Sequence, residues 1–375
     1  MKVVIAIDSF KGSISSVQAG QAISLGITDV YPDADLVAVP MADGGEGTVA
    51  ALVYALQGEI VTTEVTGPLG ERRQAVYGIV RDNTAVIEVA QACGLPLVPR
   101  EKRNPLETTT YGVGELICDA IKRGCRHFVI GLGGSATNDA GVGMLQALGF
   151  SFRNASGNEV GFGGKELQSI QTISVEEALP ALRDCTFQVA CDVTNPLYGK
   201  KGAAYVFAPQ KGASPKMVEQ LDAGLMNVAK VVETTLHQNV QVPGAGAAGG
   251  LGAAFSFFLH GTLESGIQVM LEITKLATHM QGADFVITGE GKMDAQTEMG
   301  KVPQGVARLA SKFGVPVIGL AGAISGDLSR LGLTAYFSIT PAPLSLQSAM
   351  DEVETFQNLR TTTRQIFSLV NELKH

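Results

Sequence analysis

Hydrophobic and polar positions follow two alternating patterns along the chain. Residues 3–7 form a short, continuously apolar run rich in β-branched side chains, which is typical of a buried parallel strand. Residues 15–26 then carry apolar side chains at helical spacing, and Ser15 or Ser16 could cap that helix. A strand at residues 36–39 and a helix at residues 47–56 follow. This order of strand, helix, strand and helix predicts an open α/β sheet.

The pattern changes in the middle of the chain. Residues 59–65, 73–80 and 84–89 are consecutive strand-like runs separated by turn signals, which predicts an antiparallel stretch. Helical and strand patterns then alternate again. We expect helices at residues 111–122, about 140–148 and 215–236, and strands at residues 127–130 and 186–190.

The last third resembles the first in pattern. Residues 285–287, 315–320 and 337–339 predict strands, and residues 302–313 and 353–373 predict helices. The economical organisation is a discontinuous domain built from both ends of the chain, with a second domain inserted. We therefore expect two α/β domains with mostly parallel open sheets, residues 1–70 and 284–375 forming one and residues 71–283 the other.

Composition and charge exclude several classes of protein. The chain has 375 residues, 45 glycines and a formal net charge of −8, without a run rich in lysine and arginine. Nucleic-acid binding is therefore not expected. The longest uncharged stretch, residues 234–263, is too polar for a membrane span. Five cysteines without Cys-x-x-Cys spacing indicate reduced thiols, and Asp8 interrupts the first apolar run too early for a signal peptide, so we expect a cytoplasmic protein.

Four polar segments follow predicted strands, where ligands bind in open α/β sheets. In the first, Asp8 directly follows a strand and lies three residues before Lys11, which suits a Mg²⁺ or substrate anchor. A turn with a solvated lysine would explain the same residues. In the second, Asp43 and Glu46 could bind metal or cap the next helix. Three glycines within residues 44–47 favour a functional loop, because glycine lets backbone approach a ligand.

The third segment, residues 131–139, is a glycine-rich turn between a strand and a helix, which predicts an anion cradle of backbone N–H groups. Its Gly131-x-Gly133-x-x-Ala136 pattern also matches the dinucleotide fingerprint formally. The hydroxyl and amide side chains that follow favour phosphate and metal instead. The fourth segment, residues 288–294, places two acids and a lysine in an expected tight loop. Asp192, after the strand at residues 186–190, could be a general base, a metal ligand or a turn cap.

Six segments taken together resemble the bacterial type I glycerate kinases. They are residues 8–13 (DSFKGS), 40–48 (PMADGGEGT), 133–141 (GGSATNDAG), 190–197 (ACDVTNPL), 244–252 (GAGAAGGLG) and 288–294 (TGEGKMD). The similarity extends over essentially the whole chain. It implies ATP-dependent phosphorylation of D-glycerate, with 2-phosphoglycerate as the product. It also implies two α/β domains, one inserted in the other, with the site in the cleft between them.

Roles for individual residues follow from the chemistry of phosphoryl transfer. Mg²⁺ would lie between the phosphates of ATP and one or more of Asp43, Glu46, Asp139 and Glu290. Lys11 and Lys292 would offset charge or hold the glycerate carboxylate, Asp192 would be the base, and Asp8 is a further catalytic candidate. The candidate substrate- and ATP-binding residues are Ser9, Gly44, Gly45, Gly133, Gly134, Ser135, Ala136, Thr137, Asn138, Asn195, Gly289 and Gly291.

Three alternatives remain at this stage. The same kinase could form 3-phosphoglycerate. An NAD(P)-dependent hydroxy-acid oxidoreductase would need an acid about 20 residues beyond the glycines, and Glu159 lies near that distance but in an expected turn. A non-enzymatic two-domain binding protein would leave the many loop carboxylates unexplained. The expected partners are small molecules, D-glycerate and ATP, and the expected assembly is a monomer or homodimer.

Overall fold

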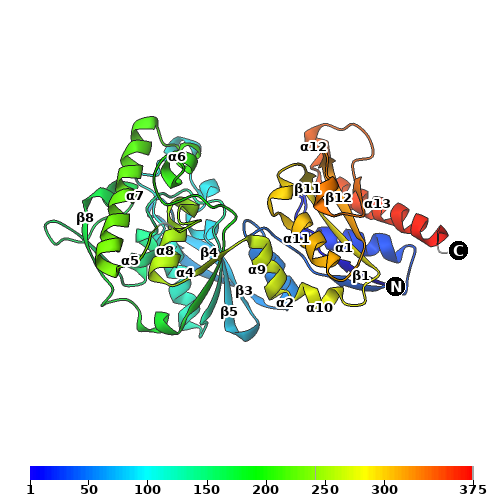
Figure 1. Ribbon diagram of the computed structural model, residues 1–375, viewed down its shortest axis with the longest axis horizontal. Helices are drawn as coiled ribbons and strands as arrows, with labels where there is room; N and C mark the ends of the chain where they lie inside the picture. Colours follow the sequence, from blue (N-terminus) through cyan, green and yellow to red (C-terminus); the bar gives the residue numbers. More distant parts are fainter. Residues whose placement is uncertain (241, 374–375) are drawn as a thin grey trace. The chain divides into compact units, whose positions relative to one another are not determined.

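The computed structural model describes residues 1–240 and 242–373 (Figure 1). The chain divides into two compact units. The first unit contains Met1–Asp43, Ala50–Gln57 and Ile267–His375, and the second contains Gly44–Val49 and Gly58–Gly266. Helix α2 (Thr48–Leu56) begins in the second unit and continues in the first. The first unit is thus built from both ends of the chain.

The first unit contains a five-stranded parallel sheet with the order β13-β12-β11-β1-β2. Figure 1 shows strands from opposite ends of the sequence side by side in it, β1 in blue beside β11 in orange. Its strands are β1 (Lys2–Ile5), β2 (Asp35–Ala38), β11 (Phe285–Met293), β12 (Val317–Ile324) and β13 (Ala335–Ser338). The expected open parallel α/β sheet is therefore confirmed.

Helices of the first unit cover this sheet. Ser15 caps the first of them, because its hydroxyl accepts the N–H of Gln18 and the Gln18 side chain returns to the Ser15 N–H. The two longest helices, α1 and α13, pack against each other, and Ile23, Ile27 and Phe367 are buried in their shared core. The helices are α1 (Ser16–Thr28), α9 (Gly266–Ile273), α10 (Leu276–Met280), α11 (Val302–Ser311), α12 (Leu346–Ala349) and α13 (Glu352–Glu372).

The second unit contains a six-stranded mixed sheet with the order β10-β9-β6-β5-β4-β3. The consecutive strands β3, β4 and β5 are antiparallel, as the sequence predicts, and the remaining pairs are parallel. The strands are β3 (Glu59–Thr66), β4 (Arg72–Val80), β5 (Thr84–Glu88), β6 (His127–Gly131), β9 (Thr186–Ala190) and β10 (Thr262–Glu264). Pairing with β4 joins β3 to this unit, whereas the sequence-based limit at residue 70 assigns it to the other.

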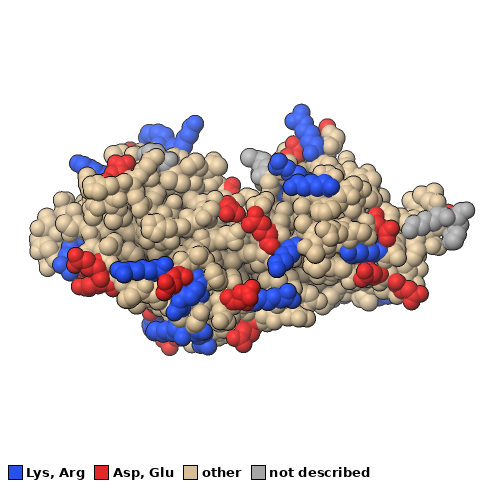
Figure 2. Space-filling model, turned by 60° about the horizontal axis from the view of Figure 1, so that its bottom comes forward, with Lys and Arg blue, Asp and Glu red and all other residues tan. Residues whose placement is uncertain are grey.

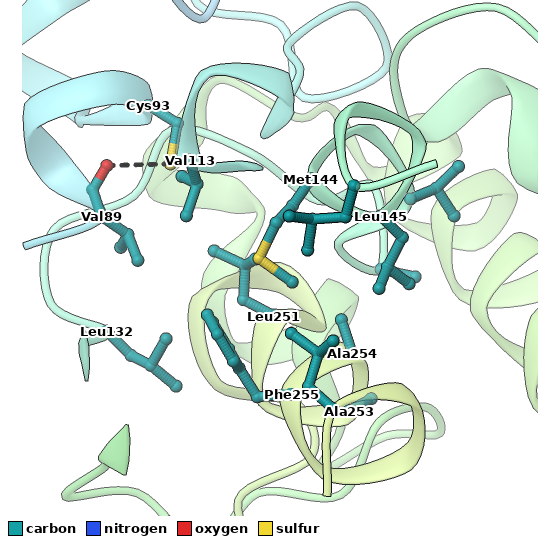
Figure 3. Close-up of a cluster of buried hydrophobic side chains, with 14 of the residues drawn as sticks. Val89, Cys93, Val113, Leu132, Met144, Leu145, Leu251, Ala253, Ala254 and Phe255 are labelled. Atoms are coloured by element: carbon teal, nitrogen blue, oxygen red, sulfur yellow. Dashed lines mark hydrogen bonds between the residues drawn. The ribbon is translucent and has the colours of Figure 1, made fainter. Parts of the chain in front are cut away.

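Helices and a small hairpin complete the second unit. The hairpin pairs β7 (Ser151–Asn154) with β8 (Ile170–Ser174). The helices are α3 (Ala90–Cys93), α4 (Tyr111–Lys122), α5 (Val142–Ala147), α6 (Ala203–Phe207), α7 (Pro215–Leu236) and α8 (Leu251–Phe258). Figure 3 shows part of the apolar core, in which Leu132, Met144 and Phe255 are among the buried side chains.

Two further features concern the whole described chain. All five cysteines are free thiols, and Cys93 and Cys125 are buried. Within residues 1–240 and 242–373, no helix is both long and apolar enough to cross a membrane.

Candidate active site

The segment at residues 288–294 is a strand rather than the expected tight loop. Strand β11 continues through Met293 because its second half pairs with β12, with Thr288 opposite Gly319 and Met293 opposite Ile324. Gly289 allows close packing, because a Cβ there would lie 2.0 Å from the Leu320 carbonyl oxygen. A Cβ at Gly291 would be in ordinary contact, 3.5 Å from the Lys11 backbone nitrogen. Gly289 therefore fits a crowded position of the strand, in which alternate side chains share a face.

Asp8 lies at the switch point of the first sheet. The chain proceeds from β1 to β2 on one side and from β11 to β12 on the other, so the order reverses between β1 and β11. The Asp8 N–H donates to the Gly289 carbonyl at 3.0 Å, which places Asp8 where β1 and β11 end their pairing. Ligands in open α/β sheets bind at such a reversal. The first and fourth predicted segments thus come together here.

The Asp8 carboxyl is buried and only partly hydrogen bonded. Its exposed fraction is 3%, and its Oδ1 accepts the Ser9 N–H at 2.7 Å and the Ser9 hydroxyl at 3.3 Å. No described residue donates a hydrogen bond to its other oxygen. Burial, together with the negative charge of Asp43, raises the pKa of Asp8 to about 7. Such a carboxyl can exchange a proton near neutral pH, which is what a general base requires.

Lys11 and Asp43 form an ion pair beside Asp8. The Lys11 ammonium lies 2.7 Å from Asp43 Oδ2. Burial lowers the pKa of Lys11, but the charge of Asp43 and the hydrogen bond to it raise this pKa above its usual value. Lys11 therefore remains a cation beside Asp8 and Asp43, as the role expected from the sequence requires.

Glu290 is held by two residues, Thr297 and Lys301, neither of which was selected from the sequence. Its Oε1 accepts the Thr297 hydroxyl at 2.5 Å, and Lys301 Nζ lies 3.5 Å from Oε2. Burial raises the pKa of Glu290, whereas Thr297 and Lys301 oppose that shift. Lys301 follows a glycine, but it lacks the rest of a phosphate-binding motif, so its sequence context gave no reason to choose it. Lys292 is exposed and pairs with Asp294 at 2.9 Å.

The glycines at residues 44 and 45 pack against the second sheet. A Cβ at Gly44, whose φ is +81°, would lie 2.6 Å from the Ala190 Cβ, and one at Gly131 would lie 2.4 Å from the Gly44 carbonyl oxygen. Similarly, a Cβ at Gly133 would lie only 2.8 Å from the Gly45 Cα. These glycines let the segment cross the carboxyl ends of β6 and β9. Packing alone accounts for them, and Glu46 is exposed on the same segment.

Glu88 is a buried acid that the sequence analysis missed. It ends β5, and its Oε1 accepts the Val49 N–H at 2.8 Å. Hydrogen bonds from the Gly47 and Thr48 amides also favour its charged form, but burial dominates and raises the pKa of Glu88. Glu88 therefore satisfies the free N–H groups at the start of α2 in place of a local cap. An acid inside the otherwise apolar run at residues 84–89 was the available signal.

The glycine-rich segment at residues 131–139 is mostly internal. Gly133 and Gly134 are exposed, whereas Ser135, Ala136, Thr137 and Asn138 are buried. The Ala136 N–H already donates to the Cys93 carbonyl at 2.8 Å. Helix α5 begins only at Val142, after Ala140 and Gly141 in the left-handed region. The expectation that the whole segment cradles phosphate is therefore too broad, since backbone N–H groups can reach a ligand only at the exposed turn.

Asp139 is committed to the protein interior. Its Oδ2 accepts the Thr110 N–H and hydroxyl, each at 2.8 Å, and its Oδ1 accepts the Gly141 N–H at 3.2 Å. Burial raises the pKa of Asp139 despite these hydrogen bonds. With 1% of its surface exposed, the side chain holds α4 and α5 together. These contacts argue against Asp139 as a magnesium ligand, in contrast to the sequence-based expectation.

Lys211 is a second buried residue that the sequence analysis missed. Its ammonium donates to the Ser135 hydroxyl at 2.9 Å and to the Thr137 carbonyl at 2.7 Å. The local sequence gave no signal for this, because Lys211 lies in a short polar turn that resembles a solvated one. The side chain of Asn138, in the same segment, is 0% exposed and has no hydrogen-bond partner within the described part of the chain.

Asp192 and Asn195 follow β9, as expected. Asp192 is exposed, and its Oδ1 accepts the Gly266 N–H at 2.8 Å. The Asn195 amide donates to the Lys201 carbonyl at 2.8 Å, which closes the loop that carries Lys200 and Lys201. Asp192 thus has a structural contact through its Oδ1 atom.

The four carboxylates expected to bind magnesium are divided between the two units. Asp43 and Glu290 belong to the first unit, and Glu46 and Asp139 to the second. Among the described residues, no three His, Cys, Asp or Glu side chains form a group able to hold a metal ion. Mg²⁺ commonly uses one or two carboxylates, substrate phosphates and water, and it prefers oxygen ligands. Asp43 and Glu290 fit that chemistry.

Two other expectations can be compared with the structure. Glu159 lies at about the sequence distance from the glycines that a ribose-binding acid would have. Its carboxylate pairs with Arg153 at 3.1 Å and accepts the Phe152 N–H. Figure 2 shows lysine and arginine interspersed with aspartate and glutamate on the face it presents, without a continuous basic stripe there. Neither observation favours a dinucleotide or nucleic acid as the ligand.

The comparisons with known proteins agree on one family. The model of the glycerate kinase family matches residues 3–371. The chain is 50% identical to glycerate 2-kinase of Escherichia coli K12, covering 93% of each chain, and 47% identical to a glycerate kinase of Haemophilus influenzae, covering 98% of each. A crystal structure of a Salmonella typhimurium LT2 protein proposed to be glycerate kinase 2 superposes with a TM-score of 0.93 at 46% identity, covering 100% of this chain and 99% of that one. The chain belongs to the glycerate kinase family.

Proposed function

We propose that the protein transfers the γ-phosphoryl group of ATP to the 2-hydroxyl of D-glycerate, giving 2-phosphoglycerate and ADP. Family membership and the 50% identity to a protein named glycerate 2-kinase support the reaction. The structural observation that carries it is the buried Asp8 carboxyl, one oxygen of which accepts no hydrogen bond from a described residue, next to the Lys11–Asp43 pair at the sheet's switch point. A base beside a cation suits the activation of a hydroxyl on an anionic substrate.

Asp8 is the base in this proposal. Its carboxylate takes the proton of the 2-hydroxyl, the hydroxyl oxygen bonds to the γ-phosphorus, and the bond from that phosphorus to the β,γ-bridging oxygen breaks to release ADP. The sequence pattern favoured Asp192 for this role. Asp8 is the better candidate because it is buried with a pKa of about 7, whereas Asp192 is exposed and holds the Gly266 N–H.

The other residues bind and orient. Lys11 pairs with the glycerate carboxylate or offsets charge on the transferred phosphoryl group. The exposed Gly133–Gly134 turn offers its backbone N–H groups to the phosphates of ATP. Asp43 and Glu290 would hold Mg²⁺, which when bound neutralises charge on the β- and γ-phosphates. Lys301 favours the ionised form of Glu290, although burial raises the pKa of this carboxyl.

The reaction is tested by ³¹P NMR of the purified protein with Mg-ATP and D-glycerate. The expected result is a new phosphomonoester signal coupled to one proton, together with ADP. Coupling to two protons would instead identify 3-phosphoglycerate, and an unchanged ATP spectrum would contradict the proposed reaction. L-glycerate in a parallel tube is the control for the acceptor.

The assignment of the base is tested by two matched variants. Asp8→Asn should lower kcat about 10²–10⁴-fold with little change in KM, whereas Asp192→Asn should lower it much less. The opposite ranking would return the role to Asp192. Both substitutions keep the shape of the side chain, so thermal melts of both variants should show folded protein.

Location and assembly belong to the same proposal. A kinase that uses ATP and a small organic acid, with five free thiols, suits the cytoplasm. We expect a monomer or homodimer. Size-exclusion chromatography with light scattering would measure the assembly, and a mass above that of two chains would contradict it.

A further inference from the structure

Lys211 joins two segments that are distant in sequence. It ends the short 3₁₀ turn Pro209–Lys211, and 3% of its surface is exposed. Its ammonium reaches across to the glycine-rich segment, to Ser135 Oγ at 2.9 Å and to the Thr137 carbonyl at 2.7 Å. These two contacts are to residues that directly follow the exposed Gly133–Gly134 turn. Lys211 is too buried to serve as a solvated surface charge.

The remainder of that segment is fixed from other directions. The Ala136 N–H donates to the Cys93 carbonyl at 2.8 Å, and the Thr108 hydroxyl donates to the Ala136 carbonyl at 2.9 Å. Asp139 is held by Thr110. Cys93 in turn rests on the apolar core, where its thiol donates to the Val89 carbonyl at 3.3 Å (Figure 3). Within the described residues, Lys211 is therefore the only charged side chain that these hydrogen bonds bring to Ser135 and Thr137.

Burying the Lys211 ammonium costs more desolvation free energy than its two hydrogen bonds would require of a neutral donor. Burial lowers the pKa of Lys211 to about 8, although Cys93 and Asp139 act in the opposite direction. Burial also raises the pKa of the Cys93 thiol to about 12, so this thiol carries no charge near neutral pH. A neutral amide could donate to Ser135 and Thr137 at a smaller desolvation cost. The positive charge is therefore expected to have a use beyond tying the segment in place.

We propose that Lys211 is a positioning residue for phosphoryl transfer, which fixes the Gly133–Gly134 turn for the phosphates of ATP and adds a buried positive charge behind it. The inference rests on the proposed function, because it assigns the turn to ATP. Lys211 acts through Ser135 and Thr137 and does not itself contact the nucleotide. Its substitution should therefore affect nucleotide binding more than binding of the acceptor.

The test compares Lys211→Met, Lys211→Gln and the control Lys165→Met. Lys165 is exposed and pairs with Glu107, and we assign no catalytic or binding role to either residue. Lys211→Met should weaken Mg-ATP binding about 10- to 100-fold, as expected for loss of hydrogen bonds from a charged group. The KM for D-glycerate should stay within about twofold. Lys211→Gln, which keeps donors but not the charge, should fall between wild type and Lys211→Met. Lys165→Met should match wild type.

A purely structural role would give a different result. It would lower the melting temperature of Lys211→Met and leave the dissociation constant for Mg-ATP unchanged at temperatures where the variant is folded. That outcome would overturn the inference. If both Lys211 variants fail to fold, the pH dependence of Mg-ATP binding by the wild-type protein tests the proposal instead. Its affinity for Mg-ATP should fall as the pH rises above about 8, where Lys211 loses its charge, and constant affinity between about pH 7 and 9.5 would overturn the proposal.

Direct binding measurements separate this inference from the proposed function. Calorimetry with Mg-ATP alone does not require an acceptor, so it tests Lys211 whichever hydroxyl is phosphorylated. No Mg-ATP binding by wild type would remove the proposed function. Binding by wild type that the Lys211 variants reproduce unchanged would remove only the role of Lys211.

Discussion

The Lys11 ammonium lies 2.7 Å from the Asp43 carboxylate, and this ion pair joins the loop after β1 to the segment after β2. The two segments are already adjacent, because the Met41 N–H donates to the Ile7 carbonyl at 2.9 Å. The pair therefore adds little to the fold. Its position beside Asp8 indicates a chemical role instead.

Lys11→Met is expected to separate activity from stability. An exposed ion pair of this kind contributes about 0.2–1 kcal/mol, so the melting temperature should change little. Turnover should fall about 10²-fold or more, because the cation that offsets phosphoryl or carboxylate charge is lost. Steady-state kinetics and a thermal melt of the same preparation check both parts. A large loss of stability with normal kcat would show that the pair is structural.

The raised pKa of Asp8 has a consequence for stability that does not depend on turnover. The folded protein holds this proton up to about pH 7, whereas the unfolded chain releases it near the ordinary value of 3.8. Stability from this group is therefore fully present below about pH 4 and is lost as the pH rises to about 7.

Asp8→Asn should accordingly melt at a higher temperature than wild type at pH 8, and this advantage should shrink towards pH 5. The comparison is made in EDTA, so that no divalent cation binds the carboxylates. Equal melting temperatures at pH 8 would show that the ionised Asp8 is accommodated without cost. A functional group that destabilises its own fold is common at active sites.

Glu88 is expected to stabilise the start of α2. Glu88→Ala removes the acceptor of the Val49 N–H and leaves buried donors without partners, which should cost about 1–3 kcal/mol. Glu88→Gln keeps an acceptor oxygen and should cost less. Urea denaturation of the three proteins measures the difference. An equal loss in both variants would indicate that the charge of Glu88, rather than its hydrogen bond, holds the segment.

The metal requirement should distinguish the candidate carboxylates. Asp43→Asn and Glu290→Gln should raise the Mg²⁺ concentration needed for half-maximal activity, since each would remove a charged oxygen ligand. Asp139→Asn should lower stability and leave that concentration unchanged, because its oxygens are occupied by Thr110 and Gly141. A Mg²⁺ titration at saturating ATP makes the comparison. A shifted requirement in the Asp139 variant would restore it as a ligand.

Local patterns in the sequence predicted most of the fold. The helix at residues 111–122, the strand at residues 186–190 and the helix at residues 215–236 have the expected bounds. In each of these elements, the spacing of apolar residues within the element itself determines whether it is a helix or a strand. The second half of β11 was missed because glycine, glutamate and lysine are unfavourable in strands. Its pairing with β12 decides the conformation instead.

The candidate site was predicted less completely, for a related reason. Asp8, Lys11 and Asp43 are visible in sequence because polar residues follow apolar strands. Lys211 is not, because the contact that gives it a role joins residues more than seventy positions apart. The glycine-rich segment shows a further limit. Its composition suggests exposure, whereas in the structure only Gly133 and Gly134 of residues 131–139 are exposed.

Because residues 288–293 belong to strand β11 and not to a loop, the length of this segment cannot change without disturbing the site. Side chains on β11 alternate between the two faces of the sheet, so one residue inserted between Ile287 and Glu290 would turn Glu290 to the opposite face. Loops absorb insertions and deletions, but this segment can change only by substitution. Relatives that accept other substrates should therefore keep its length, and attempts to redesign the acceptor should exchange residues here and place any added chain elsewhere.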